Sequence, residues 1–369
     1  MSVRAAKKGD EAPVPFWPVH AVWTLALNNE LTHPPAFDEA NGYFPIEGDR
    51  LVAYALADGT QLWTTHAATW NAPTAGGGFV FFVEARAMVA LHASDGSLAW
   101  RTPLDDDLAA APAWAAGWLL LATKRGAAIA LRADDGHEIW RRDLGGVARA
   151  PIAVSADRAY APLDDHRVVA LQIESGAPVW ERKLGGVPND ILALDDRLFV
   201  GSSDNYFYCL TTDSGRVDWR WRAGADVIGL PAVDERRVYF VSLDNVVRAL
   251  NRSNGVQQWI QLLTLRPTGG PLRAGATVIV YGAAPPLRAV NAADGKGGGD
   301  IAATGTLAAP PHLLGADAAS PMLIVVTRDI AKGDTVTLIT RSVEPAASPV
   351  AALPNPVTAV PPLRPATGA

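Results

Sequence analysis

The sequence has one cysteine, few charged residues and no long apolar run, and each shortage excludes a class of protein. A single cysteine in 369 residues, Cys209, excludes an intrachain disulfide and a thiolate-cluster metal site. Charged residues make up 19% of the chain, and the formal net charge is −6, so no basic field is present to hold a nucleic acid backbone. The uncharged internal stretch at residues 108–123 is shorter than the about 20 residues of a membrane-spanning helix and contains Pro112 and Gly117. We expect neither a nucleic-acid partner nor a transmembrane segment.

The composition is that of a globular chain with many turns. Hydrophobic residues make up 49%, and 33 glycines and 28 prolines accompany them, which excludes disorder over most of the length. Residues 1–18 are expected to form an N-terminal extension; Gly9-Asp10-Glu11 stand where a secretory signal would place its apolar run. Residues 344–369 are rich in proline and alanine, and we interpret them as a flexible tail. Residues 19–343 remain for the folded domain.

Seven of the 12 tryptophans follow one period. They are separated by 40, 37, 40, 40, 39 and 40 residues: Trp23, Trp63, Trp100, Trp140, Trp180, Trp219 and Trp259. From Trp63 onward, each follows by four residues a glycine that is itself preceded by Asp, Ser or Asn. The unit reads A-L-x-x-x-[DSN]-G-x-x-x-W, and a further copy at residues 289–295 has Gly299 where the tryptophan is due. A period of this length is typical of a repeat architecture.

Between the tryptophans the pattern predicts strands rather than helices. Apolar and β-branched residues form short runs bounded by turn residues, as at residues 238–242 and 246–250. The Asn-Gly and Asp-Gly pairs supply the positive φ that tight hairpins require. With a short first strand near a proline, each unit holds about four antiparallel strands, which is the size of a propeller blade.

The number of units predicts how the ring closes. Seven units end at the tryptophans from Trp63 onward and at Gly299, and residues 322–327 and 335–341 form two strands beyond them, with a short inner strand near residues 312–314. The strand around Trp23 has no blade before it. Joining these remainders predicts an all-β, eight-bladed β-propeller of four-stranded antiparallel blades, closed by the N-terminal strand in the C-terminal blade. Closure removes an open sheet edge, and we expect a monomeric ring.

The repeated unit resembles the tryptophan-docking repeat of the PQQ-like (quinoprotein alcohol dehydrogenase-like) β-propeller superfamily. The ring size is similar to that of the BamB type, a lipoprotein component of the bacterial outer-membrane β-barrel assembly machinery. The resemblance implies that each docking tryptophan packs between adjacent blades, where its ring is buried and its N–H can reach a carbonyl. It also implies a non-catalytic scaffold that binds a protein partner, in outer-membrane protein assembly or another cell-envelope complex. The implied location is the periplasmic side of the outer membrane, although without a visible export signal a cytoplasmic location stays open.

The same superfamily contains quinone-dependent dehydrogenases, so the fold alone does not determine the function. Resemblance to these enzymes would imply a vicinal cysteine pair beside the quinone, a calcium site and a catalytic aspartate. Cys209 stands alone, and spacings between 37 and 40 residues leave no insertion long enough to cover a cofactor. We therefore expect no cofactor and no catalytic residue. A degenerate quinoprotein dehydrogenase and a propeller that binds a small ligand or carbohydrate remain as alternatives.

Other patterns indicate no metal or phosphate site. The seven histidines are scattered without ligand-like spacing, and we expect them at the surface. The carboxylate run Asp105-Asp106-Asp107 lacks the alternating oxygen ligands of a calcium loop. The glycine runs at residues 76–78 and 297–299 lack the Lys-Ser/Thr or following helix of a phosphate loop, so we interpret them as flexible turns.

The most variable parts of the repeat are the connections from one unit to the next, which in a propeller lie on one face around the central axis. Our hypothesis is that four polar residues in these connections contact a partner polypeptide at this rim, with an aromatic anchor beside them. The four are Arg149, Asn189, Asp190 and Asp226, and the anchor is Trp70. The alternative is that these residues only cap the ends of strands.

Overall fold

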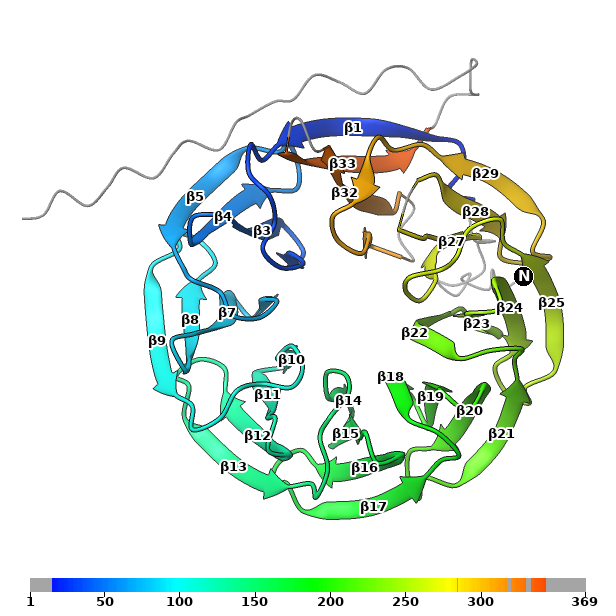
Figure 1. Ribbon diagram of the computed structural model, residues 1–369, viewed down its shortest axis with the longest axis horizontal. Coiled ribbons are helices and arrows are strands. Elements are labelled where there is room, and N and C mark those ends of the chain that lie inside the picture. The colour runs from blue at the N-terminus through cyan, green and yellow to red at the C-terminus, as the bar shows by residue number, and fades with distance from the viewer. Residues whose placement is uncertain (1–14, 284, 317–319, 330–332, 343–369) are drawn as a thin grey trace, which may run out of the picture.

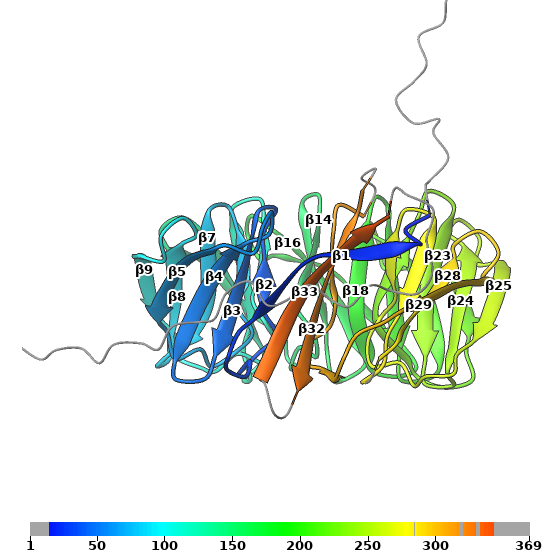
Figure 2. The ribbon, with the colours of Figure 1, turned by 90° about the horizontal axis from the view of Figure 1, so that it is seen from above.

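The periodic apolar runs and turns fold into eight antiparallel sheets arranged as a ring, as the computed structural model shows (Figure 1). The structure describes residues 15–283, 285–316, 320–329 and 333–342. These residues contain 33 strands and no helix, so none of them forms a helix that could cross a membrane. Seen from the side the ring is a flat disc whose strands run across its thickness (Figure 2). The predicted eight-bladed propeller is confirmed.

The first four blades follow one another along the chain. Blade 1 consists of β2 (Ala36–Phe37), β3 (Asn41–Ile46), β4 (Arg50–Ala55) and β5 (Gln61–His66). Blade 2 consists of β6 (Thr74–Gly76), β7 (Phe79–Glu84), β8 (Ala87–His92) and β9 (Leu98–Pro103). Blade 3 consists of β10 (Ala113–Ala115), β11 (Trp118–Ala122), β12 (Ala127–Arg132) and β13 (Glu138–Asp143). Blade 4 consists of β14 (Ala153–Ser155), β15 (Arg158–Pro162), β16 (Arg167–Gln172) and β17 (Pro178–Lys183).

The remaining blades continue this order until the ring closes. Blade 5 consists of β18 (Pro188–Leu194), β19 (Arg197–Ser202), β20 (Tyr206–Thr211) and β21 (Val217–Arg222). Blade 6 consists of β22 (Val227–Val233), β23 (Arg237–Ser242), β24 (Val246–Asn251) and β25 (Gln257–Leu262). Blade 7 consists of β26 (Leu272–Ala274), β27 (Thr277–Val280), β28 (Leu287–Asn291) and β29 (Gly297–Ile301). Blade 8 consists of β30 (Thr306–Leu307), β31 (His312–Leu314), β32 (Met322–Asp329), β33 (Gly333–Arg341) and β1 (Val19–Ala26).

The ring closes through β1, as the sequence predicts. β1 pairs antiparallel with β33, in a register that runs from Val19 opposite Arg341 to Ala26 opposite Thr335 (Figure 1). β33 pairs in turn with β32, so the N-terminal strand is the outer strand of the C-terminal blade. This pairing satisfies the backbone edge that the last blade would otherwise expose.

The periodic tryptophans join neighbouring blades. The indole N–H of each donates to a backbone carbonyl of the next blade. The acceptors, in chain order from Trp23 to Trp259, are Leu56, Ala93, Ala133, Ile173, Thr212, Arg252 and Ala292, at 2.6 to 3.3 Å. The glycine of the next copy lies against the indole ring. At Gly176, for example, φ is +63° and an added Cβ would lie 2.6 Å from Trp140, so a side chain there would displace the ring.

The contact between blades 7 and 8 is built differently. At Gly299, where the period lacks its tryptophan, the ring of Trp17 packs on the backbone, and an added Cβ would lie 2.7 Å from it. The neighbouring Phe16 is 1% exposed and its N–H donates to Thr277 Oγ1 at 2.9 Å. Trp17 precedes β1 and so approaches the contact from blade 8, whereas the periodic tryptophans approach from the preceding blade. Residues 1–14 and the tail at 344–369 lie outside the described residues.

The prediction that both glycine runs are flexible turns is wrong for residues 297–299, which lie in β29, whereas Gly77 and Gly78 do form the turn between β6 and β7. An added Cβ at Gly76, the last residue of β6, would lie 2.3 Å from the ring of Trp114 on the neighbouring blade. Gly297 and Gly299 are part of β29, and Gly299 lies under Trp17. Glycine is needed at Gly76 and Gly299 because an aromatic ring from another blade approaches the backbone closely.

Candidate functional site

The connections between successive blades and the turns between each blade's second and third strands lie on one face, which we call the mouth face. Backbone hydrogen bonds join each connection to the blade that it enters. Arg149 N donates to Pro162 O at 2.9 Å, Leu243 N to Asp226 O at 2.9 Å, and Thr268 N to Tyr281 O at 3.3 Å. The connections are therefore held at both ends and along their length.

Carboxylates fix these connections further. Asp164 accepts a hydrogen bond from Val147 N at 3.1 Å, and Asp244 accepts one from Gly224 N at 3.0 Å. Burial opposes the charge of Asp244, but hydrogen bonds from Arg248 and Ser242 outweigh it and lower the pKa of this carboxyl. Asp106, within the carboxylate run, accepts from Arg125 N at 2.7 Å. These acids hold the backbone in place, so the mouth face presents its other side chains from fixed positions.

Trp70 is the exposed aromatic residue of this face. Of the 12 tryptophans, all within the described residues, it alone is more than half exposed, at 54%. Its backbone N–H donates to Val83 O at 2.8 Å, and the adjacent Asn71 accepts from Val83 N at 2.8 Å. Glu84 accepts from Ala68 N at 2.9 Å. The connection between β5 and β6 is thus rigid, and it holds a large apolar ring in solvent.

Arg149 and Asn189 differ in how free their side chains are. Arg149 is exposed, and within the described part of the chain its guanidinium has no hydrogen bond or ion pair. Asn189 lies at a bulge of β18, and its Nδ2 donates to Val227 O of blade 6. Asn189 therefore joins blades 5 and 6.

Asp190 and Asp226 lie near this junction. Burial raises the pKa of Asp190. Burial, followed by the nearby charge of Asp190, also raises the pKa of Tyr281 on blade 7. Asp226 immediately precedes β22, and its carbonyl accepts from Leu243 N while its side chain stays partly exposed. Blades 6 and 7 meet closely here, because an added Cβ at Gly229 would lie 2.0 Å from Gly270 N.

The structure gathers some of the predicted residues and leaves one apart. Asn189, Asp190 and Asp226 lie together where blades 5 and 6 meet, and Arg149 lies on the connection into the neighbouring blade 4. Trp70 lies between blades 1 and 2, across the ring from them (Figure 1). One small contact could not include all five residues, whereas a partner lying across the mouth face could reach both groups.

We expect Asp190→Asn to raise the melting temperature at pH 7 by a few degrees. The folded-state pKa of Asp190 lies above its unfolded value, so the folded state binds more protons between the two values and stability falls as pH rises through that window. The difference between variant and parent should therefore shrink as pH falls to about the unfolded value of 3.8. Calorimetric melts at several pH values measure it. Asp157→Asn, on a turn of the other face where the carboxylate is 70% exposed, serves as the control that leaves the melt unchanged.

The positions of the histidines and of the cysteine do not match those of a catalytic site. The prediction that the histidines lie at the surface is wrong for His312, which is half-buried and stacks on Phe37 with ring centres 4.4 Å apart; burial lowers its pKa to about 4. Cys209 is buried in β20, and burial raises the pKa of its thiol to about 11. Within the described residues no three His, Cys, Asp or Glu side chains lie close enough to hold a metal ion.

Two features of the structure were not indicated by the motifs. The backbone of Gly269 closely approaches Tyr281, because a Cβ added at Gly269 would be 2.1 Å from the Tyr281 hydroxyl. A cavity lined by Arg197 and Arg252 lies between blades 5 and 6 on the face opposite the mouth face. The signal that could have located it is Phe199, which stands where three other copies of the repeat have tyrosine, Tyr43, Tyr160 and Tyr239.

Comparison with known proteins gives one family and several similar structures. The model of the family described as outer membrane protein assembly factor BamB matches residues 20–107, 47–191 and 185–325. No curated protein sequence matches the chain. The crystal structure of BamB from Moraxella catarrhalis is 20% identical, covers 87% of this chain and 99% of its own, and superposes with a TM-score of 0.69.

More distant structures share the ring. The quinohemoprotein alcohol dehydrogenase from Comamonas testosteroni is 12% identical, with a TM-score of 0.67, and the match covers 90% of this chain and 78% of the enzyme. The computationally designed Ika8 protein is also 12% identical, with a TM-score of 0.70, and the match covers 86% of this chain and 99% of the design. At these identities the likeness concerns the fold.

The described residues do not fit a bound quinone. The vicinal cysteine pair is missing, and Cys209 packs inside a blade, opposite Trp219 of the outer strand, instead of facing the ring axis. Asp106 and Asp164 of the mouth face accept from backbone N–H groups, and no three possible ligands lie together in the described part of the chain.

Proposed function

Because the chain belongs to the outer membrane protein assembly factor BamB family of PQQ-like propellers, we propose that it is a non-catalytic scaffold whose mouth face binds a partner protein. The observation that carries this proposal is Trp70, a half-exposed aromatic ring on a connection fixed by Asn71 and Glu84. A rigid aromatic anchor loses little conformational entropy on binding, and aromatic residues and arginine are enriched in the energetic centres of interfaces. Arg149 supplies an unpaired guanidinium on the same face.

The partner and place follow from the family. We infer that the partner belongs to outer-membrane protein assembly or another complex of the bacterial envelope, and that the ring acts on the periplasmic side of the outer membrane. With acids at Asp190 and Asp226, a guanidinium at Arg149 and an apolar ring at Trp70, the fitting partner surface carries an apolar pocket, basic residues opposite the acids and an acidic residue opposite Arg149.

Site-specific photocrosslinking tests the proposal. A photoreactive phenylalanine analogue is placed at position 70 or 226 of the full chain in its native cells, and at Asp157 on the opposite face as the control. The mouth-face positions are expected to yield one shared polypeptide adduct that position 157 does not, and Arg149→Glu should diminish that adduct. Equal adducts from both faces, or none from the mouth face, would refute the proposal.

A ligand titration separates the scaffold from the degenerate quinoprotein. A ligand that binds the folded state raises stability by RT ln(1 + [L]/Kd), about 2.7 kcal/mol at one hundred times Kd. We expect pyrroloquinoline quinone together with calcium to leave the calorimetric melting temperature unchanged. A saturable rise of the melting temperature would instead favour the quinoprotein. This readout uses the purified chain and does not depend on whether a partner protein binds.

A further inference from the structure

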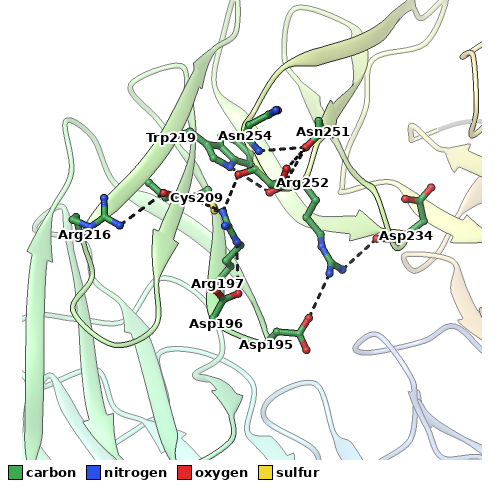
Figure 3. Close-up of polar contacts among 12 residues, drawn as sticks. Asp195, Asp196, Arg197, Cys209, Arg216, Trp219, Asp234, Asn251, Arg252 and Asn254 are labelled. Atoms are coloured by element: carbon green, nitrogen blue, oxygen red, sulfur yellow. Dashed lines mark hydrogen bonds and ion pairs between the residues drawn. The ribbon is translucent and has the colours of Figure 1, made fainter.

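Blades 5 and 6 border an open cavity of about 260 Å³ on the face opposite the mouth face. Its walls come from three turns that approach each other there, at residues 194–197, 235–236 and 251–253 (Figure 3). Leu194 supplies apolar surface, Phe199 borders the cavity but is fully buried, and the remaining lining is charged or polar. This volume lies just below the about 300 Å³ at which sites for drug-sized ligands begin.

A missing hydroxyl contributes to the cavity. In blade 6 the hydroxyl of Tyr239 donates to Asp234 at 2.5 Å and lies 3.1 Å from Ala292 O, the same carbonyl that accepts the indole of Trp259. In blade 5 the corresponding residue is Phe199, whose ring lies 6.0 Å from Trp219. The carbonyl of Arg252 thus accepts the Trp219 indole at 3.3 Å, and no tyrosine hydroxyl fills the space beside it.

Two guanidiniums cross the cavity between the blades. Arg197 of blade 5 is bonded to Asp218 and donates to Ser253 O of blade 6 at 3.3 Å. Arg252 of blade 6 donates to Asp234 O at 3.2 Å and reaches Asp195 of blade 5 at 3.5 Å (Figure 3). Their side chains are 24% and 27% exposed, so both are held within the wall and still reach solvent. The long contact to Asp195 leaves Arg252 with donor capacity to spare.

The lining carries balanced charge. Three guanidiniums, of Arg197, Arg236 and Arg252, face three carboxylates, of Asp195, Asp196 and Glu235. A ligand of either charge would meet as many like charges as opposite ones. A hydroxyl both donates and accepts, so a ligand with several hydroxyls can pair with the carboxylates and the guanidiniums at once. The C–H face of a sugar ring could lie on Leu194, which is half-buried.

We propose that this cavity binds one sugar ring, either as a free monosaccharide or as the terminal residue of a glycan chain. The carboxylates of Asp195 and Asp196 accept from its hydroxyls, and the guanidinium of Arg252 donates to them. The site lies opposite the mouth face and uses none of the residues of the proposed protein-binding surface. Its failure would therefore leave the crosslinking result unaffected.

The experiment follows the indole N–H signal of Trp219 by NMR in the full chain, because its acceptor is the carbonyl of Arg252. The probes are D-glucose and N-acetyl-D-glucosamine as free sugars and N,N′-diacetylchitobiose as a chain end. We expect a saturable shift of Trp219 with at least one of them and none of Trp63, whose contact lies across the ring. Tighter binding of the disaccharide than of its monosaccharide would identify a glycan end as the ligand; equal binding would identify the free sugar.

Two variants locate the site. Phe199→Tyr places a hydroxyl in the cavity, as at Tyr239, and is expected to weaken sugar binding at least about tenfold; Phe81→Tyr makes the same change in blade 2, 5.9 Å from Trp100, and should leave binding unchanged. Arg252→Gln, checked by its melting temperature, should also weaken binding about tenfold. No saturable shift with any sugar, equal binding in both Phe199→Tyr and Arg252→Gln, or a saturable shift with inorganic phosphate or glycine betaine alone would overturn the proposal.

Discussion

Replacing Trp140 by alanine is expected to lower the free energy of unfolding by about 3 to 5 kcal/mol, the range for truncating a buried aromatic side chain. The ring is 8% exposed, packs on Gly176 of the next blade and donates to Ile173 O at 2.6 Å. Alanine would leave a void between blades 3 and 4 and an unpaired carbonyl. Urea unfolding followed by fluorescence and far-ultraviolet circular dichroism measures the loss.

Two further variants separate the causes. Trp140→Phe keeps a ring but removes the N–H, and should cost about 1 kcal/mol for the hydrogen bond in addition to the smaller ring. Trp70→Ala removes a tryptophan that is 54% exposed, and should change stability by no more than about 0.5 kcal/mol while weakening the mouth-face adduct. Equal losses of unfolding free energy for Trp140→Ala and Trp70→Ala would contradict the conclusion that the periodic tryptophans stabilise the contacts between blades.

Replacing Asp334 by alanine is expected to cost about 3 kcal/mol, because it leaves the buried Leu31 N–H without its acceptor and removes one of the two ion pairs of Arg328, which keeps the pair with Glu30 at 2.9 Å. Asp334 is 0% exposed, accepts from Arg328 Nε at 2.8 Å and Nη2 at 2.9 Å, and accepts from Leu31 N at 2.7 Å. Arg328 also donates to Leu31 O at 3.2 Å. These contacts tie the last blade to the segment that leads from β1 into blade 1, so their loss weakens the closure of the ring.

An exposed ion pair provides the matched control. Asp300 pairs with Arg288 at 2.8 Å on blade 7, with side chains 48% and 36% exposed, and Asp300→Ala should change stability by less than about 1 kcal/mol. Calorimetric melts of the two alanine variants compare them directly. The Asp334 variant should also become more sensitive to proteolysis at its N-terminal segment. If Asp334→Ala melts at as high a temperature as Asp300→Ala, the β1–β33 pairing is enough to close the ring and Asp334 is not needed.

The spacing of the repeat by itself predicts the contacts between equivalent positions of successive copies. A docking tryptophan and the glycine of the next copy are both periodic, so Trp140 on Gly176 follows from the sequence. The contact of Trp17 with Gly299 does not follow from the sequence, because Trp17 lies outside the period and approaches from blade 8, on the other side of the contact from the periodic tryptophans. The bonds from Asp334 to Leu31 join residues near the two ends of the chain, and no pattern in either segment indicates the other.

The candidate sites show the same division. The exposure of Trp70 could not be read from its residue type, since most tryptophans of this chain are buried or half-buried against a neighbouring blade. Asn189 was a candidate contact residue, and the structure shows that its amide joins blades 5 and 6. The cavity between these blades depends on the hydroxyl that Phe199 lacks and on two arginines brought together from different blades.

By itself the sequence determined the repeated blade, the number of blades and the joining of the two ends, because strand length, turn chemistry and the spacing of indoles are local properties that recur in every copy. Only the tertiary structure decided which polar groups are used up in joining blades and which remain free for ligands, since that depends on distances between side chains of different copies. Those distances are set when eight similar sheets, which carry different side chains, pack against one another in one closed ring.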